Sequence, residues 1–392
     1  MSKMNKKKNR GWLLILLLLI LVTAVLYLIF SGWLNQWIGK PSNNVLDKTE
    51  IYILRDRDAS ETECMNGLVI SAGKTGVRAY DAKGQICWDI AYTMQQPRLF
   101  TCEGYALVAD YGATQAVLIR EDGENVAISA DAPILFARVD EGGRVLLAST
   151  DTKRNSLSLY DAQGTLLLRR VTYQNKDGIP IAAAVSADGK RLAGAYVSYT
   201  GGAICTNMTV FDLSDNGADL TDRILGNYRL DEQLVSDLYF RGHDLFFVGD
   251  ACFGVLDAAR DCTPAWRVEP SYEITFAAVT NDTLAIGYGD PKAGTATPAS
   301  EYFFLYDKSG KVLYHGLSEA PTSLSAAAGV FVVGDGHAFH GISARGRILW
   351  EKDFTVEYRR LLPLADQNTV VAVGPERLEY YYVRNKWEVE QK

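Results

Sequence analysis

Short apolar runs separated by polar turns fill most of this chain. The runs are rich in Val, Ile, Leu, Tyr and Phe, and Gly, Asp and Asn lie between them. Such a pattern is typical of antiparallel strands and not of helices. One stretch can be divided into four successive strands, RLFTC, YALVADY, QAVLIRE and NVAIS. The pattern therefore predicts an all-β domain whose structural unit has four strands.

One hairpin recurs along the chain, built from an apolar strand, an acidic turn containing Gly, and a second strand. Clear copies are VRAYDAKGQICWDI, LSLYDAQGTLLLRR and FFLYDKSGKVLYHG. The turns are marked by Asp81, Asp122, Asp161, Asp212, Asp257, Asp307 and Ser343, at intervals of 41, 39, 51, 45, 50 and 36 residues. An eighth hairpin is expected in the last residues, LEYYYVRNKWEVE.

A period of about 40–50 residues with four strands per repeat is typical of β-propellers. The sequence therefore predicts a propeller of eight four-stranded blades over residues 50–392. A seven-bladed ring with a shared closing strand and an array of β-sandwiches are the alternatives. The strands inside each blade should be apolar throughout, because both of their faces pack against neighbouring blades.

A single long apolar segment precedes the repeats. No charged residue occurs from Gly11 to Gly39, and the 19 residues from Trp12 to Phe30 are almost wholly apolar. As a helix they would span about 28 Å, close to the hydrocarbon thickness of a bilayer. The basic residues before the segment favour a cytoplasmic N-terminus and an external C-terminal domain. They are Lys3, Lys6, Lys7, Lys8 and Arg10.

A cleaved signal peptide is the alternative to this signal anchor. Its apolar core would be shorter, and Ile29–Gly32 is a poor cleavage site. The predicted organisation is a cytoplasmic basic tail over 1–11, a transmembrane anchor over 12–34, a linker over 35–49 and an extracytoplasmic propeller over 50–392. The predicted location is the cell membrane, crossed once.

The hairpins resemble the repeats of quinoprotein-type (PQQ-like) propellers. Ala79, Asp81, Gly84 and Trp88 match the pattern A-x-D-x-x-G-x-x-x-W of that family. The resemblance implies that the Trp after the turn docks between blades, which makes Trp88 and Trp350 structural. The layout of one anchor followed by such repeats is similar to uncharacterised membrane-anchored propellers of Gram-positive bacteria.

The resemblance implies the scaffold and not the dehydrogenase. Quinoprotein enzymes use a calcium site, a catalytic Asp and often a vicinal disulfide, and the sequence offers no match to this set. No cofactor, metal site or catalytic residue is therefore predicted. His337 and His340 are three residues apart and, on an extended strand, would point to opposite faces. An enzyme that uses the propeller funnel, a hydrolase or a quinoprotein relative, remains the alternative function.

Cys252 and Cys262 flank one hairpin and are the best candidates for a disulfide among six cysteines. Two free thiols are the alternative, because strict register does not place the two residues directly opposite each other. An external domain would lie on the oxidising side of the membrane, where disulfides persist.

One face of the propeller is predicted to carry the function. In an up-and-down blade with strands A to D, the B–C and D–A connections emerge at the same edge. Several B strands end in an acidic step, and several D–A connections contain a Tyr. These candidates are Asp110, Asp250, Asp290 and Asp335 together with Tyr92, Tyr173, Tyr272 and Tyr358. Asp and Gly also favour turns for local reasons, so a purely structural role is the alternative.

Charge narrows the class of partner. The net charge of −7 includes the five basic residues before the apolar segment; without them, 35 basic residues face 47 acidic ones. Such an acidic domain argues against nucleic acid as a partner. We therefore expect a binding or assembly scaffold at the cell envelope, with a protein or glycan partner such as a cationic peptide, and with the membrane contacted through the anchor.

Overall fold

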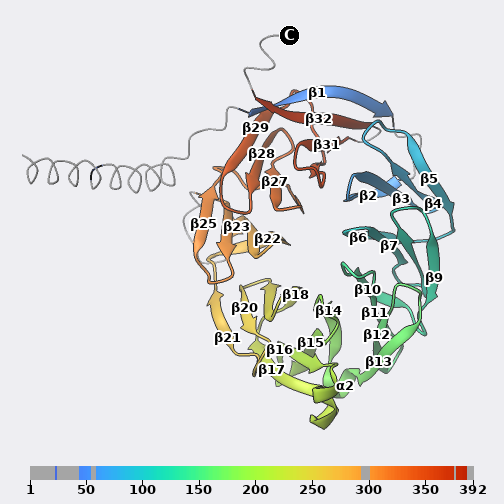
Figure 1. The fold of residues 1–392 in the computed structure, drawn as a ribbon. Coiled ribbons are helices and arrows are strands. Elements are labelled where there is room, and N and C mark those ends of the chain that lie inside the picture. The colour runs from blue at the N-terminus through green and yellow to red at the C-terminus, as the bar shows by residue number, and fades with distance from the viewer. Residues whose placement is uncertain (1–22, 24–43, 54–58, 293–300, 375–376, 386–392) are drawn as a thin grey trace, which may run out of the picture. The chain divides into compact units, whose positions relative to one another are not determined.

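The computed structural model describes residue 23 and residues 44–53, 59–292, 301–374 and 377–385. Within residues 44–392 the strands form eight antiparallel sheets of four strands each. Figure 1 shows these sheets arranged as blades around a centre, with strands such as β6 and β14 inside and strands such as β9 and β17 outside. The predicted eight-bladed, all-β propeller is therefore confirmed.

The first four blades follow the chain in order from strand A inside to strand D outside. Blade 1 contains β2 (Ala59–Met65), β3 (Leu68–Gly73), β4 (Gly76–Tyr80) and β5 (Ile86–Ala91). Blade 2 contains β6 (Pro97–Cys102), β7 (Tyr105–Asp110), β8 (Gln115–Arg120) and β9 (Asn125–Ser129). Blade 3 contains β10 (Ile134–Val139), β11 (Val145–Thr150), β12 (Arg154–Tyr160) and β13 (Leu166–Tyr173). Blade 4 contains β14 (Ile179–Val185), β15 (Arg191–Thr200), β16 (Ala203–Asp212) and β17 (Ile224–Asp231).

The next three blades repeat this order. Blade 5 contains β18 (Val235–Arg241), β19 (Asp244–Gly249), β20 (Phe253–Asp257) and β21 (Pro264–Val268). Blade 6 contains β22 (Tyr272–Thr280), β23 (Thr283–Pro291), β24 (Phe303–Asp307) and β25 (Val312–Gly316). Blade 7 contains β26 (Ser323–Ala327), β27 (Val330–Gly334), β28 (Ala338–Ser343) and β29 (Ile348–Asp353). The described helices are short: α2 (Gln174–Asp177), η1 (Asp215–Asp219) and η2 (Thr221–Arg223).

Blade 8 is built from both ends of the chain. Its strands A to C are β30 (Arg360–Pro363), β31 (Thr369–Val373) and β32 (Arg377–Asn385). Its outer strand is β1 (Asn44–Ile53), which pairs antiparallel with β32. The expectation of a linker up to residue 49 is thus wrong from Asn44 onward, because hydrogen bonding to β32 turns this polar stretch into a strand. The outer strand expected in WEVE lies outside the described residues, and its place in the sheet is taken by β1.

Contacts of a buried carboxylate join β1 to β32. Glu379 on β32 is fully buried, and its Oε2 atom lies 2.6 Å from the Lys48 ammonium of β1. The same oxygen accepts a hydrogen bond of 2.8 Å from the Tyr381 hydroxyl. Burial alone would raise the pKa of Glu379, but hydrogen bonds from Lys48, Tyr358 and Tyr381 outweigh burial and hold this pKa below its usual value. The ring is therefore closed without a covalent bond, by a strand ladder and an ion pair.

The predicted transmembrane anchor, residues 12–34, falls outside the described residues apart from Thr23. Within the described part of the chain, no helix has the length and apolar character needed to cross a bilayer.

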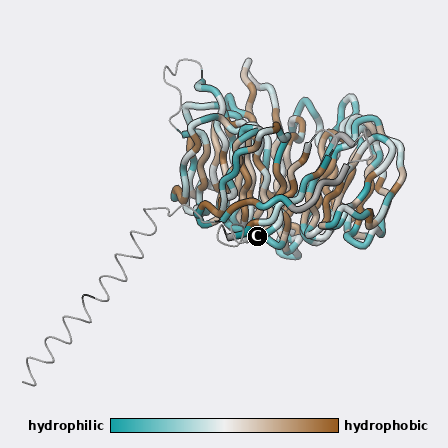
Figure 2. The backbone as a smooth tube through the Cα atoms, turned by 90° about the horizontal axis from the view of Figure 1, so that it is seen from above, coloured by the Kyte–Doolittle hydropathy of each residue, from teal (hydrophilic) through white to brown (hydrophobic). Residues whose placement is uncertain are grey.

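Apolar side chains between neighbouring blades form the core. There are eight buried clusters, one at each junction of consecutive blades, including that of blade 8 with blade 1. The B strands are buried on both faces; Val330 to Gly334 of β27, for example, are all buried. Figure 2 shows hydrophobic segments along the strands and hydrophilic ones at the two edges of the ring. Each large apolar side chain buried in this way contributes about 1.5–3 kcal/mol.

The acidic turn markers act as local caps of the hairpins between strands C and D. The Oδ1 atom of Asp81 accepts 2.8 Å hydrogen bonds from the backbone amides of Lys83 and Gln85. Asp161 and Asp307 bind the amides two and four residues further along in the same way. A short carboxylate that binds its own turn is a standard reason for Asp at this place. These repeat residues therefore shape the turns.

Candidate binding face

The two edges of the ring differ in which connections they carry. We call the edge with the A–B and C–D turns the C–D face, and the edge with the B–C and D–A connections the B–C face. All eight predicted site residues lie at the B–C face: each Asp at or after the end of a B strand, and each Tyr at a D–A connection. The up-and-down order of the strands produces this placement.

The four aspartates differ strongly in exposure. Asp110 is 3% exposed and accepts hydrogen bonds from the backbone amides of Gln95, at 3.0 Å, and Gln96, at 2.7 Å. It therefore fixes the connection that enters its own blade. Asp250 is exposed and accepts a 2.9 Å bond from the Leu234 amide, whereas Asp290 is exposed at the end of β23.

Asp335 is half-buried in the turn between β27 and β28. Its Oδ1 atom accepts hydrogen bonds from the amides of His337, at 2.8 Å, and Ala338, at 2.7 Å. Burial alone would raise the pKa of Asp335, but these bonds outweigh burial and lower it. The carboxylate is thus ionised and is used by its own turn.

The four tyrosines are also unequal. Tyr358 is 2% exposed, and its hydroxyl lies 3.4 Å from the Tyr381 hydroxyl in the core between blades 7 and 8. Tyr92 and Tyr272 are half-buried, and burial raises the pKa of Tyr92. Tyr173 is 50% exposed. Of the eight predicted residues, only Asp250, Asp290 and Tyr173 are therefore open to a partner, because the others are wholly or partly enclosed by the fold.

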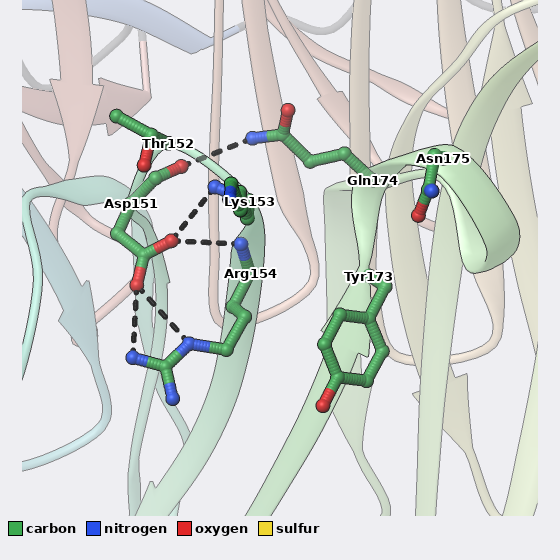
Figure 3. A pocket seen from close by; sticks show the side chains of 7 residues that line it. All are labelled: Asp151, Thr152, Lys153, Arg154, Tyr173, Gln174 and Asn175. Atoms are coloured by element: carbon green, nitrogen blue, oxygen red, sulfur yellow. Dashed lines mark hydrogen bonds and ion pairs between the residues drawn. The ribbon is translucent and has the colours of Figure 1, made fainter.

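Tyr173 lines a pocket of about 590 Å³ on the B–C face, beside the β11–β12 turn and α2 (Figure 3). It pairs across the strands with Arg154, whose guanidinium lies 3.1 Å from the Asp151 carboxylate. The charges in this pocket are of both signs. It is lined by Asp151, Thr152, Lys153, Arg154, Tyr173, Gln174 and Asn175.

The B–C face of blades 4 to 6 is dominated by carboxylates. We call the following six exposed residues the acidic sector: Asp231, Glu232, Asp250, Glu269, Glu273 and Asp290. Four of them were not predicted, because the sequence reasoning looked for Asp after B strands and Tyr in D–A connections. The signal was present, since Asp231, Glu232, Glu269 and Glu273 all flank D–A connections.

Few cations compensate the acidic sector. Arg229 pairs with Asp231 at 2.7 Å, and Arg267 pairs with Glu269. Lys292 donates both of its recorded hydrogen bonds to backbone oxygens, of Ala251 and Pro270. Within the described ranges, Glu232, Glu273 and Asp290 have no cationic partner. The sector therefore has twice as many carboxylates as nearby cations and presents a net negative field to the solvent.

Several charged residues on the inner strands are, in contrast, paired with one another across blades. Arg98 contacts Glu61 at 2.6 Å, and Arg138 contacts Asp237 at 2.5 Å. Arg360 contacts Glu63 at 2.8 Å. These pairs neutralise one another, whereas Glu273, also on an inner strand, has no cationic partner among the described residues.

The two predicted structural tryptophans both lie at blade junctions. Trp350 is 1% exposed in the cluster between blades 7 and 8. Trp88 packs against the cluster between blades 1 and 2, and its Nε1–H donates a 3.0 Å bond to the Glu121 carbonyl of blade 2. Trp266 makes the same contact, with the Lys308 carbonyl of blade 6 at 2.7 Å. The sequence reasoning missed Trp266 because its hairpin turn is two residues longer.

Cys252 and Cys262 are buried free thiols in this structure, so the predicted disulfide is absent and the alternative holds. The reason is topological. Cys252 lies in the B–C connection, whereas Cys262 lies in the C–D turn at the other end of β20. A strand of five residues separates them by roughly 17 Å, far beyond the reach of a disulfide.

Comparison with known proteins supports the fold and leaves the activity open. A model described as "Family of unknown function (DUF5711)" matches residues 42–382. No curated protein matches the sequence.

Two solved structures are similar in fold. Raptor from Chaetomium thermophilum is similar with a TM-score of 0.50 and 11% identity, covering 87% of this chain. This chain spans only 29% of the Raptor chain. Hydrazine synthase from Kuenenia stuttgartiensis is similar with a TM-score of 0.47 and 12% identity, over 86% of this chain and 97% of that one. Such low identities concern the fold alone, and the resemblance to quinoprotein repeats stays a prediction.

Proposed function

We infer the role of this chain, which belongs to DUF5711, a family of unknown function, from its own geometry. We propose that it is a membrane-anchored binding scaffold at the cell envelope. The scaffold captures a cationic partner on its B–C face. The observation that carries this proposal is the acidic sector. Three of its carboxylates have no cationic partner among the described residues, and the three are all exposed. An uncompensated field of this kind raises the rate at which a cationic partner associates.

The position of β1 is consistent with such a scaffold. Strand β1 begins at Asn44, which pairs with Asn385 at the C–D face. A tether that enters the propeller at Asn44 is therefore joined to the edge opposite the acidic sector. The anchor itself is inferred from the apolar residues 12–34 and the basic residues before them.

Binding of a labelled octalysine peptide to the full-length protein in lipid nanodiscs, measured by fluorescence anisotropy, tests the binding role. The test variant combines Glu232→Gln, Glu273→Gln and Asp290→Asn. Each exposed charge contributes about 0.5 kcal/mol, so the combined variant should bind roughly tenfold more weakly. Affinity of the wild-type protein should fall steeply between 50 and 300 mM salt, because the Debye length shortens.

A matched control removes the same number of charges from the C–D face, with Glu103→Gln, Glu124→Gln and Glu141→Gln. All three residues are exposed in A–B or C–D turns. The control should keep the wild-type affinity within about twofold. Equal losses in the two triple variants would show that only net charge matters, and would refute a binding role for the B–C face.

The proposed location is tested separately. Protease added to intact cells should release a soluble fragment containing the propeller, because an external domain is accessible. Complete protection of the propeller in intact cells, with digestion after lysis, would place the domain inside and overturn the topology.

A further inference from the structure

The B–C hairpin of blade 4 extends well past those of its neighbours. Strands β15 and β16 have 10 residues each, whereas β19 and β20 of blade 5 have 6 and 5. The hairpin ends in Gly201 and Gly202, both with positive φ, which a tight two-residue turn requires. Its outer part therefore continues at the B–C face beyond the length of the strands of blade 5.

The side of the hairpin that faces blade 5 is apolar except for Thr206. Lower down, Ala195 and Met208 of this side pack in the core shared with blade 5. The same side continues outward, because side chains alternate along a strand and cross-strand partners share a face. It continues as Tyr199 and Ile204, which are direct cross-strand partners. Tyr199 is 74% exposed and Ile204 is 44% exposed.

A third exposed apolar side chain belongs to the segment that is hydrogen-bonded to this hairpin. Leu234 lies in the D–A connection that enters blade 5 and is 36% exposed. The hydroxyl of Thr206, on the same side of β16 as Ile204, donates a 2.7 Å bond to the carbonyl of Gln233. This bond holds the Leu234 segment against the base of the hairpin. We call Tyr199, Ile204 and Leu234 the apolar corner.

The apolar corner is interleaved with the acidic sector through direct contacts. The backbone amide of Glu232 donates a 2.8 Å bond to the carbonyl of Ile204. The amide of Leu234 donates to the Asp250 carboxylate at 2.9 Å. Ile204 and Leu234 are thus each hydrogen-bonded to an acidic residue.

We propose that this corner binds an extended cationic segment of a partner protein, which places one aromatic or aliphatic side chain between Tyr199, Ile204 and Leu234. Charge complementarity with Glu232 and Asp250 selects Lys or Arg on either side of that apolar residue. Burial of the apolar side chain supplies the specificity that an acidic surface alone lacks. The inference rests on the proposed function and names the site and the chemistry of its partner.

Two synthetic peptides test the proposal, each of nine residues with Lys alternating with Gly around a central Phe or a central Ala. Binding of both to the full-length protein in nanodiscs is measured by anisotropy. The wild-type protein should prefer the Phe peptide about tenfold, the gain expected from partly burying one aromatic side chain. Tyr199→Ser combined with Ile204→Ser should abolish this preference and retain the weak, salt-sensitive binding that both peptides share.

A matched control places the same substitutions on exposed apolar residues elsewhere, with Ile86→Ser and Val312→Ser. These side chains are 52% and 40% exposed on outer strands of blades 1 and 6. The control should keep the tenfold preference. Unchanged thermal unfolding of both variants would show that the hairpin substitutions act on binding.

The outcomes separate the two proposals. Equal affinity of the wild-type protein for the two peptides, or a preference that survives in the hairpin variant, overturns the apolar corner and leaves the cationic partner standing. Absence of any salt-sensitive binding refutes the proposed function as well. Dimerisation of the wild-type protein that the hairpin variant loses would instead identify a second copy of the chain as the occupant.

Discussion

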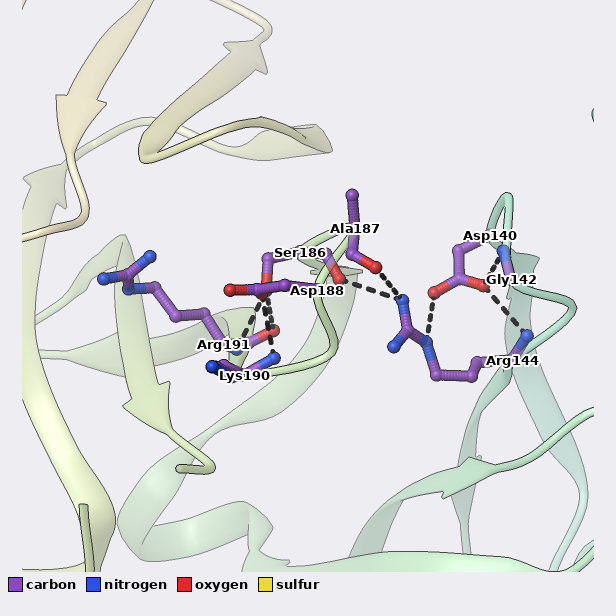
Figure 4. Close-up of polar contacts among 8 residues, drawn as sticks. All are labelled: Asp140, Gly142, Arg144, Ser186, Ala187, Asp188, Lys190 and Arg191. Carbon is purple, nitrogen blue, oxygen red and sulfur yellow. Dashed lines mark hydrogen bonds and ion pairs between the residues drawn. The ribbon is translucent and has the colours of Figure 1, made fainter. Parts of the chain in front are cut away.

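On the C–D face, the long side chains of Arg144, Trp88 and Trp266 bind the backbone of the next blade, whereas on the B–C face Asp110 and Asp250 bind the connection that enters their own blade. Arg144, in the A–B turn of blade 3, lies 2.6 Å from Asp140 and donates to the carbonyls of Ser186, at 3.1 Å, and Ala187, at 2.7 Å, in blade 4 (Figure 4). On the opposite edge, Asp110 and Asp250 bind only amides of the connection that enters their own blade.

The difference indicates at which positions a substitution would alter the arrangement of the blades. A side chain that bridges two blades fixes their relative position, so its replacement alters the ring. A side chain that binds its own connection fixes one loop, and neighbouring positions remain free to serve a partner. Exposed positions of the B–C face can therefore carry the acidic sector and the apolar corner, as long as Thr206 and Lys292, which bind across blades there, are retained.

Removal of the largest buried junction side chain should have the largest effect. Trp350→Ala removes a fully buried indole from the core between blades 7 and 8, and should lower the free energy of unfolding by about 3–5 kcal/mol. Chemical denaturation measures this change. Val356→Ala, at a side chain that is 41% exposed, is the control and should change stability by less than about 0.5 kcal/mol. A loss below about 1 kcal/mol for Trp350→Ala would mean that the junction cores do not hold the ring together.

Closure of blade 8 should depend on pH. The pKa of Glu379 is lower in the folded protein than in the unfolded chain, so its contribution to stability is complete above the unfolded value of about 4.3 and is lost as pH falls below it. Lys48→Met leaves the buried carboxylate without its nearest cation and should cost about 2 kcal/mol at pH 7, less than a wholly buried pair because the Lys48 side chain is 43% exposed.

The matched variant for this closure is Glu379→Gln. Its unfolding free energy should vary less between pH 6 and pH 3.5 than that of the wild-type protein, measured by denaturant titration at each pH. An identical pH dependence in the two proteins would assign the acid sensitivity to other carboxylates.

A structural feature of this protein was predictable from sequence when the residues that produce it are close together in the chain. The hairpin turns were predictable because Asp81 and its equivalents bind amides only two and four residues away. The closure by β1 was not, because its partner β32 lies at the other end of the chain and the polar sequence of β1 resembles a linker. The sequence predicted which face the candidate site residues lie on, but not which of their side chains are exposed. Asp110 and Asp250 follow equivalent strands, and only packing around them makes the first buried and the second exposed.

These two aspartates give a direct comparison within the B–C face. Asp110→Asn replaces a buried carboxyl group that accepts bonds from two amides, and should cost about 2 kcal/mol of stability. Asp250→Asn, at an exposed position with one such bond, should cost less than about 0.5 kcal/mol. Denaturant unfolding of both variants measures the difference, and equal losses would show that burial does not separate their roles.

Loss of a bond between blades on the C–D face should have a smaller effect than loss of the Asp110 carboxylate. Trp88→Phe and Trp266→Phe each keep an aromatic ring and remove one indole N–H, which donates to Glu121 or Lys308 of the next blade. Each should cost about 1 kcal/mol, the usual net contribution of one hydrogen bond. Both rings also fit against a glycine of that next turn: a Cβ on Gly123 or Gly310 would lie 2.9 Å from the indole. Trp350→Phe, whose indole has no recorded hydrogen bond within the described residues, should lose packing alone. Unfolding of the Trp88→Phe and Trp266→Phe variants at the wild-type denaturant concentration would show that these bonds do not stabilise the blade junctions. The apolar cores alone would then hold the blades together.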